Sequence, residues 1–177
     1  TNLHIDLDGL GPIQATLDRF GLDGIELRRG VEDIPAYEAD INNRVTARGL
    51  VQLFGAIHEG RAATPELSRW MIDVLMQQEF TGGIPAGLPD EIRPGVTVAN
   101  KTGEISNMAH DSGLVFLPDG AAYAIAVLTE TPRGVTPKQA TVARLARAVY
   151  DEVMAQRQSP ADAAGAPHGE AAREDAR

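Results

Sequence analysis

Residues 96–128 read VTVANKTGEISNMAHDSGLVFLPDGAAYAIAVL, and this stretch decides the fold. It holds three apolar runs, at 96–98, 113–117 and 123–128, in which β-branched and aromatic residues typical of strands recur. The turn sequence PDG at 118–120 joins the last two runs, so we predict an antiparallel hairpin there. Both of these runs are apolar at nearly every residue, which indicates that helices cover both faces of the sheet.

Amphipathic helices are predicted before and after this region. One follows Gly11-Pro12, a second begins near Leu50, and a third starts at Thr64, whose hydroxyl can cap it. A capping box at residues 136–139 predicts the start of a last helix. Their apolar stripes are expected to be core, and consist of Ile13, Leu17, Phe20, Leu50, Leu53, Phe54, Ile57, Leu67, Trp70, Met71, Val74, Leu75, Val142, Leu145, Val149, Tyr150 and Val153. Helices, then strands, then a helix predict an α+β fold, with an antiparallel sheet flanked by helices on both faces.

The chain is predicted to hold one domain, over residues 1–157, followed by a disordered tail over residues 158–177. The tail has no Phe, Trp or Tyr and no periodic apolar face, so it cannot bury enough surface to order itself. Residues 21–43 mix glycine, proline and charge, and are predicted to form a long loop. Judged alone, that loop could be functional or simply a solvated surface segment.

Composition limits the partners that the chain is expected to bind. The net charge is −9 and no Lys/Arg cluster is present, which argues against nucleic acid and against an anionic membrane surface. No apolar run is long enough to cross a bilayer. The absence of cysteine excludes disulfides and thiolate ligands, and no two histidines have metal-ligand spacing on one helical face. We therefore expect neither a metal nor a cofactor.

The tripeptide Lys101-Thr102-Gly103 carries the chemistry that the sequence suggests. The lysine ammonium would attract an anionic substrate group, and the threonine hydroxyl could hydrogen-bond the same group. Gly103 leaves the backbone open to a substrate, and the peptide N–H of Glu104 could then point at a developing oxyanion. Taken by itself, the tripeptide could equally be an ordinary strand end with an exposed lysine.

A Ser-His-Asp triad is not expected in this chain. His110, Asp111 and Ser112 are consecutive, and adjacent residues of a strand point to opposite faces, so their side chains cannot converge. The tripeptide at 101–103, by contrast, is one of the marks of class A β-lactamases and penicillin-binding proteins.

Further segments strengthen this likeness by their order along the chain: TNL at 1–3, LDRFG at 17–21, NRVTA at 43–47 and IPAGLP at 84–89. From Thr1 to about Met154 the chain resembles the C-terminal two-thirds of class A β-lactamases and their serine-hydrolase relatives. The charged residues 21–43 fall where that family has its omega loop. The resemblance implies a β-lactamase-like fold truncated at the N-terminus, one part of a serine hydrolase domain.

The resemblance also implies an acyl-enzyme mechanism. In the family, the serine of a Ser-x-x-Lys motif attacks a β-lactam or D-Ala-D-Ala carbonyl, and the serine of Ser-Asp-Asn assists proton transfer. Neither motif is present, and Ser-Asp-Asn would lie just before Thr1, so this chain alone is expected to be inactive. By likeness, Lys101, Thr102 and Glu104 are the expected catalytic groups, and Asn2 and Gly103 are expected to join them in binding the substrate.

Two departures from the family pattern bear on the reaction. Counting back from Asn43 places Gly30 where class A enzymes have the glutamate that activates the deacylating water. Glu32 is the best candidate for that base, but only a shift of the loop would bring it into place. Ser112 stands where many members have a substrate-gripping arginine, so His110 and Asp111 are candidates for that binding role, or are strand residues with local hydrogen bonds.

Three functions stay open on the sequence: a β-lactamase with a role in antibiotic resistance, a penicillin-binding D,D-peptidase or transpeptidase, and a catalytically dead binding module of the same fold. The expected partner is a small molecule, a β-lactam or a cell-wall peptide, and we expect a monomer. The resemblance implies a periplasmic or secreted protein, although these residues contain no signal sequence.

Overall fold

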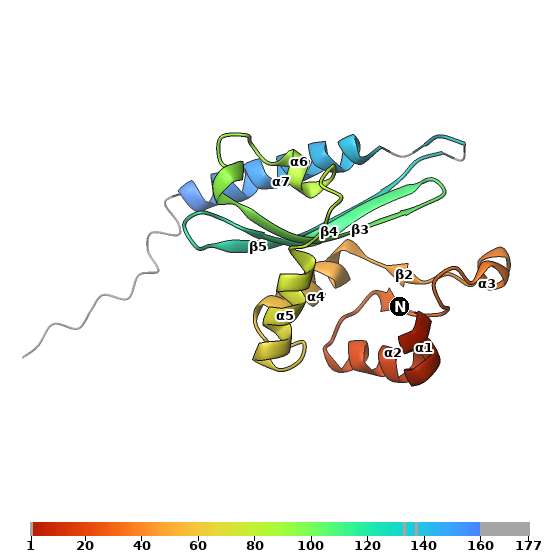
Figure 1. Ribbon diagram of the computed structural model, residues 1–177. Coiled ribbons are helices and arrows are strands. Elements are labelled where there is room, and N and C mark those ends of the chain that lie inside the picture. The colour runs from red at the N-terminus through yellow and green to blue at the C-terminus, as the bar shows by residue number, and fades with distance from the viewer. Residues whose placement is uncertain (1, 133, 137, 160–177) are drawn as a thin grey trace, which may run out of the picture.

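The computed structural model describes residues 2–132, 134–136 and 138–159, and its centre is a three-stranded antiparallel sheet (Figure 1). The strands are β3 (Thr97–Ile105), β4 (Met108–Phe116) and β5 (Ala122–Glu130), in the order β3-β4-β5. The second strand is longer than its apolar run at 113–117, so His110 and Asp111 lie within the sheet. Both β3 and β5 are edge strands among the described residues.

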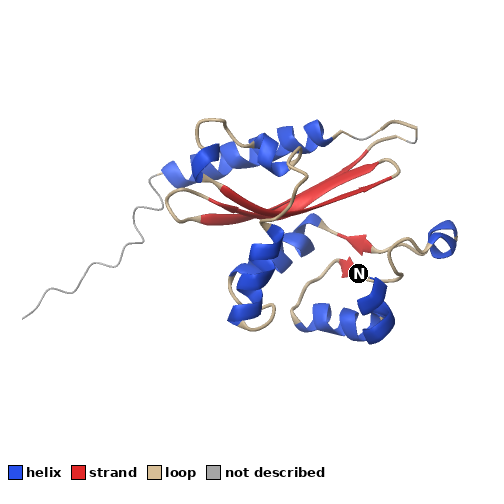
Figure 2. Cartoon of the chain, viewed as in Figure 1, coloured by secondary structure: helices blue, strands red, loops and turns tan. Residues whose placement is uncertain are grey.

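Helices cover both faces of this sheet, which confirms the predicted α+β architecture (Figure 2). One face carries α6 (Ile84–Gly87) and α7 (Gln139–Gln158), and the other carries α4 (Ala47–His58) and α5 (Pro65–Leu75). A short 3-10 helix, η1 (Arg93–Gly95), leads from α6 into β3.

The sheet separates two apolar cores because successive side chains of a strand point to opposite faces. Val115 lies in the core beneath α6 and α7, together with Ile84 and Val142. Its neighbour Leu114 lies in the core beneath α4 and α5, together with Phe54. This double burial is the reason for the unbroken apolar runs in the sequence.

The first part of the chain forms a smaller unit that carries the long loop. Its elements are α1 (Asn2–Asp8), α2 (Leu10–Arg19), β1 (Ile25–Glu26), α3 (Ile34–Glu38) and β2 (Arg44–Val45). The short strands pair antiparallel, Ile25 with Val45, and thereby close residues 27–43 into a loop. The loop contains one short helix, α3, whose first turn is capped by the carboxylate of Asp33.

The core stripe predicted on α5 is partly wrong. Trp70 is 61% exposed and Leu67 is 50% exposed, whereas Met71, Ile72 and Leu75 pack on the core. The helix starts as predicted, with the Thr64 hydroxyl accepting a hydrogen bond from the N–H of Leu67 at 3.2 Å. Because apolar residues occupy two adjacent faces of this helix, the periodicity by itself could not show which face is buried.

Two predictions for α7 also need correction. The helix begins at Gln139 with Lys138 as its cap and no side-chain capping bond, so the capping box is not formed. Leu145 and Val149 are exposed rather than buried, while Val142 is buried as expected. Of the predicted tail, Gln158 is the last residue of α7, and residues 160–177 lie outside the described part of the chain. None of the helices in the described residues is long and apolar enough to span a membrane.

Candidate functional site

The tripeptide Lys101-Thr102-Gly103 lies in the middle of β3, on the edge of the sheet. Lys101 is exposed, and its ammonium donates a hydrogen bond to the carbonyl oxygen of Thr102 at 2.6 Å. Lys101 and Asn100 line a cavity of about 300 Å³ together with residues at and just beyond the end of α5. The ammonium is therefore accessible, and its one described hydrogen bond is to a neighbouring backbone oxygen that a substrate anion could replace.

The register of the ladder shows which side chains share a face. Lys101 pairs with Ser112 and Gly103 pairs with His110, and these four residues lie on the face that carries α4 and α5. Thr102 pairs with Asp111 on the opposite face. The ammonium and the hydroxyl, which were expected to bind the same substrate group, therefore lie on opposite faces of the strand, because neighbouring side chains alternate. One ligand can reach both groups only around the open edge of β3.

Glu104 also points to the α7 face, where Gln139 donates a hydrogen bond to its carboxylate. This bond ties the end of β3 to the start of α7. The group of Glu104 expected to act on a substrate is its peptide N–H. The hydrogen bond of the side chain does not involve this N–H, which remains a candidate for stabilising the oxyanion.

Asp111 is fully buried, which is not compatible with the predicted direct contact to a substrate. Its carboxylate accepts hydrogen bonds from the N–H of Ile84 at 2.8 Å and from the Asn100 amide at 2.9 and 3.1 Å. Burial raises the pKa of the Asp111 carboxyl above its usual value, although the hydrogen bonds from Asn100 and Ile84 oppose that shift. Asp111 therefore joins β4, β3 and the start of α6 from inside the protein.

His110 is half-buried and lies directly across from Gly103. Its Nδ1 accepts a hydrogen bond from the N–H of Thr129 at 3.1 Å, which leaves Nε2 as the ring nitrogen available to a ligand. Because Gly103 has no side chain, nothing on β3 covers the ring from that position. His110 thus remains a candidate for binding a substrate on the Lys101 face.

The side chain of Asn2 is hydrogen-bonded to the long loop. Its amide donates to the carbonyl of Val31 at 2.7 Å and accepts from the N–H of Val31 at 2.8 Å. Both polar groups of the side chain are therefore occupied by one residue of the loop. Asn2 thus positions the loop through a contact across 29 residues that no local pattern could reveal, and its part in substrate binding stays a prediction.

Replacement of Asn2 by alanine is expected to free this part of the loop, because it removes two hydrogen bonds worth about 1 kcal/mol together at an exposed site. The amide of Val31 should then exchange its hydrogen at least several times faster, as measured by NMR. Asn42→Ala, which removes another amide of the same loop, should leave the Val31 amide unchanged. Equal exchange in the wild type and the Asn2 variant would contradict the assignment.

The neck of the loop is closed by Asn43. Its side-chain oxygen accepts hydrogen bonds from the N–H groups of Arg28 at 2.7 Å and Arg29 at 3.0 Å, and its amide donates to the Arg29 carbonyl at 3.1 Å. These three hydrogen bonds hold the two ends of the loop together, in addition to the pairing of β1 with β2. The loop is a closed unit rather than a freely solvated segment.

Glu32, the predicted base, lies on this loop with a backbone φ of 61°, an uncommon value for a residue other than glycine. It is exposed and lines a cavity of about 620 Å³ with Asn2, Arg28 and Val31. No hydrogen bond or ion pair described in the structure joins Glu32 to Lys101 or Thr102. The neighbouring carboxylate, Asp33, is already used as the cap of α3.

A contact that the sequence did not suggest links the loop to the β3–β4 hairpin. The hydroxyl groups of Tyr37 and Ser106 are 3.4 Å apart, and the guanidinium of Arg29 lies 5.6 Å from the centre of the Tyr37 ring. The loop therefore reaches the hairpin turn that follows the Lys101 tripeptide. A possible signal was that Tyr37 is the single aromatic residue in positions 21–43.

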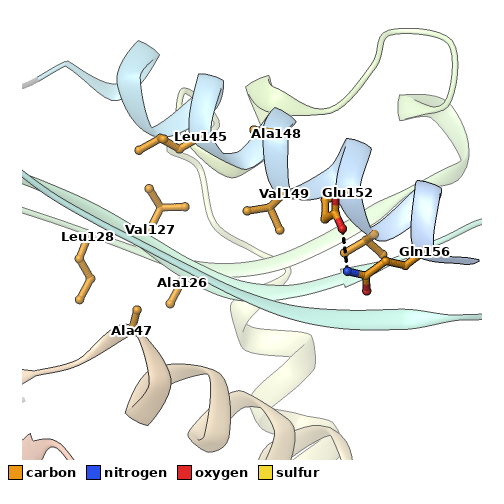
Figure 3. Close-up of a pocket in the computed structure, with 10 residues that line it drawn as sticks. Ala47, Ala126, Val127, Leu128, Leu145, Ala148, Val149, Glu152 and Gln156 are labelled. Atoms are coloured by element: carbon orange, nitrogen blue, oxygen red, sulfur yellow. Dashed lines mark hydrogen bonds between the residues drawn. The ribbon is translucent and has the colours of Figure 1, made fainter.

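A different cavity, of about 550 Å³, wraps around the open edge of β5 (Figure 3). Apolar side chains of β5 and α7 form most of its lining, including Leu128, Leu145 and Val149. Its polar lining side chains include Glu152 and Gln156, which are hydrogen-bonded to each other at 2.7 Å. This cavity offers no nucleophile or cation, so the edge of β3 is the better candidate site.

Comparisons with known proteins identify the family and the fold of this chain. The model of the Beta-lactamase enzyme family matches residues 1–153. No curated protein matches the chain in sequence.

Solved structures show the same fold. The structure of PBP-A superposes with a TM-score of 0.74 at 24% identity, covering 87% of this chain and 55% of that one. An acyl-enzyme complex of a PBP-A mutant with penicillin-G gives a TM-score of 0.71 at 23% identity, covering 83% and 52%. A beta-lactamase from Sphaerobacter thermophilus DSM 20745 gives 0.74 at 23% identity, covering 88% and 57%. The chain thus spans little more than half the length of the structures that it matches.

Proposed function

The chain belongs to the beta-lactamase enzyme family, and from this premise we propose that it is the C-terminal part of a serine hydrolase acting through an acyl-enzyme. The observation that carries the proposal is the position of Lys101-Thr102-Gly103. The tripeptide lies on the open edge of β3, its lysine is accessible, and the loop over residues 27–43 reaches the end of the same hairpin. An extended edge with a cation beside it suits a ligand that carries both a peptide-like amide and an anion.

In the proposed reaction the side chains of this chain bind and polarise the substrate. The ammonium of Lys101 and the hydroxyl of Thr102 hold the substrate carboxylate at the edge of β3. The N–H of Glu104 stabilises the oxyanion that develops on the attacked carbonyl, and Gly103 leaves room for that carbonyl to approach.

The nucleophile is proposed to precede Thr1. None of the serines in this chain (Ser68, Ser106, Ser112 and Ser159) is followed three residues later by lysine. Binding groups without a nucleophile cannot form an acyl-enzyme, so the chain alone is expected to be inactive.

A β-lactam is the proposed substrate class. The PBP-A mutant whose fold this chain shares forms an acyl-enzyme with penicillin-G, which supports a β-lactam as the first substrate to test. A role in antibiotic resistance would follow from rapid hydrolysis. Export to the periplasm or the medium, and a monomeric state, are part of the same proposal.

A penicillin-binding D,D-peptidase is the second candidate function. The observation that favours it is the identity of the loop residues beside Asn2. Asn2 holds Val31, and neither Val31 nor its neighbour Gly30 has a carboxylate to activate water. An acyl-enzyme without such a base would be long-lived. A catalytically dead binding module of the same fold is the third candidate.

The proposal is tested by incubating the protein that includes the residues preceding Thr1 with a fluorescent penicillin. We expect one covalent adduct, detected by intact-protein mass spectrometry, and no adduct with residues 1–177 alone. Rapid release of the adduct would favour a β-lactamase, and slow release would favour a D,D-peptidase. Absence of any adduct with penicillins, cephalosporins and activated esters would overturn the enzymatic proposal and leave the binding module.

Glu32→Gln distinguishes a working base from a solvated loop carboxylate. If Glu32 activates the deacylating water, hydrolysis of the adduct should slow by about 100-fold, the usual contribution of a general base. Glu38→Gln, an identical change on α3 of the same loop, should have no effect. Unchanged deacylation in the Glu32 variant would assign the base elsewhere.

In that case Gly30→Glu is the variant to make. A Cβ at this position would lie 3.3 Å from the Asn2 side-chain oxygen, so the Asn2 side chain must move by a few tenths of an ångström to accommodate it.

A further inference from the structure

We propose that Asn100 and Asp111 form a buried pair that positions Lys101 for the substrate carboxylate. The inference rests on the proposed function, because it assumes that Lys101 binds that group. It assigns to Asp111 an indirect role in place of the direct contact that its burial prevents.

The pair is enclosed by the protein on every side. Asp111 is 0% exposed and Asn100 is 2% exposed, and both oxygens of the carboxylate lie within 3.1 Å of the Asn100 amide nitrogen. One of these oxygens also accepts the N–H of Ile84. A buried carboxylate is costly to desolvate, so apolar packing alone would be better served by an apolar side chain at this position.

Two glycines make this arrangement possible. A Cβ on Gly83 would collide with the Asp111 carboxylate, and a Cβ on Gly113 would lie only 2.7 Å from the Cα of Asn100. The start of α6 and the strand β4 therefore approach the pair more closely than any other residue type allows. Gly83, just before α6, and Gly113, on β4, thus both leave space for the pair.

The geometry connects the pair to Lys101 through the backbone. Asn100 immediately precedes Lys101 on β3, and Thr102 immediately follows Lys101. Asp111 is the ladder partner of Thr102. Among the described residues β3 has a partner strand on one side only, so one row of ladder bonds holds it. The hydrogen bonds between Asn100 and Asp111 attach β3 to β4 a second time, at the residue next to Lys101. They lie on the face of the sheet opposite to the Lys101 ammonium.

The lysine side chain depends on this attachment because it has little other support. The one hydrogen bond described for the ammonium is to Thr102, a residue of the same tripeptide. A shift of the β3 backbone would therefore carry the ammonium with it. The pair is a positioning device, whereas Lys101 touches the substrate.

The test compares Asn100→Leu, which keeps the volume and removes the amide, with Asn107→Ala. Asn107 is the matched control because its amide bonds Glu130 and the Thr131 carbonyl at the far end of the same hairpin. In the protein that includes the proposed nucleophile, the measured quantity is the acylation rate with a penicillin divided by that with its methyl ester. This ratio measures how much binding of the substrate carboxylate speeds acylation. A smaller amount of folded protein lowers both rates equally and leaves the ratio unchanged.

We expect Asn100→Leu to lower this ratio by about 10-fold, and Asn107→Ala to leave it within a factor of about two. Asp111→Asn should also retain the ratio, because the Asn100 amide can turn and accept a hydrogen bond from the new amide. If Asn100→Leu does not fold, Asn100→Ala serves in its place. An unchanged ratio in a folded Asn100 variant overturns the inference.

Hydrogen exchange separates this inference from the proposed function. In the same protein, the Asn100 variant should speed exchange of the amides of residues 101–104 at least 10-fold relative to Asn107→Ala. If the wild type forms no adduct, the proposed function fails, and unchanged exchange at these amides would still overturn the pairing. Faster exchange with an unchanged ratio would show that the pair supports β3 without positioning the lysine, which also overturns the inference.

Discussion

Lys101→Ala is expected to lower the second-order rate constant of acylation by penicillin about 100-fold. The ammonium supplies a charge-assisted hydrogen bond to the substrate carboxylate, which is worth about 1.5–3 kcal/mol, and each 1.4 kcal/mol corresponds to a factor of about ten. The lysine is exposed and makes no ion pair in the described structure, so the free energy of unfolding should change by less than about 0.5 kcal/mol. Stopped-flow fluorescence with a labelled penicillin measures the rate.

Lys138→Ala is the control for this substitution. Lys138 is the chain's other lysine and caps α7, away from the tripeptide in sequence, so its loss removes the same charge from the protein. The acylation rate of this variant should match that of the wild type. Acylation of Lys101→Ala at the wild-type rate would show that the edge of β3 does not bind the substrate.

Gly113→Ala is expected to have the largest effect on stability. Its Cβ would lie 2.7 Å from the Cα of Asn100 and would also collide with the carbonyl oxygen of Ala99, and neither of these backbone atoms can turn aside. The strands β3 and β4 must then separate where the Asn100–Asp111 pair joins them. Overpacking of this kind costs about 3 kcal/mol, which urea denaturation followed by circular dichroism would measure.

Gly103→Ala provides the matched comparison on the same strand pair. A Cβ there meets no atom within 4 Å, and the backbone is not in the left-handed region, so stability should change by less than about 0.5 kcal/mol. The added methyl group lies on the face of Lys101 and His110, so acylation should slow instead. Equal losses of stability in the two glycine variants would contradict the packing described for Gly113.

Local patterns in the sequence predicted the main strands and helices of this fold. Thr64 caps α5 through its hydroxyl, and the doubly apolar runs of β4 and β5 are covered on both faces, as their composition predicts. The same patterns failed where two faces of one helix were equally apolar. On α5, the stripe containing Trp70 and the stripe containing Met71 are both apolar, and only packing against β3 selects the second.

The candidate site divides in the same way. The sequence by itself determined that Lys101, Thr102 and Gly103 are consecutive, because that follows from chain connectivity, whereas the structure places them in the middle of β3. Only the tertiary structure decided that Asn2 holds Val31 and that Asp111 holds Ile84, contacts that span 29 and 27 residues. Such hydrogen bonds depend on where distant elements meet. The propensities of neighbouring residues carry no information about that meeting point, so the roles of these two side chains could be assigned only from the folded chain.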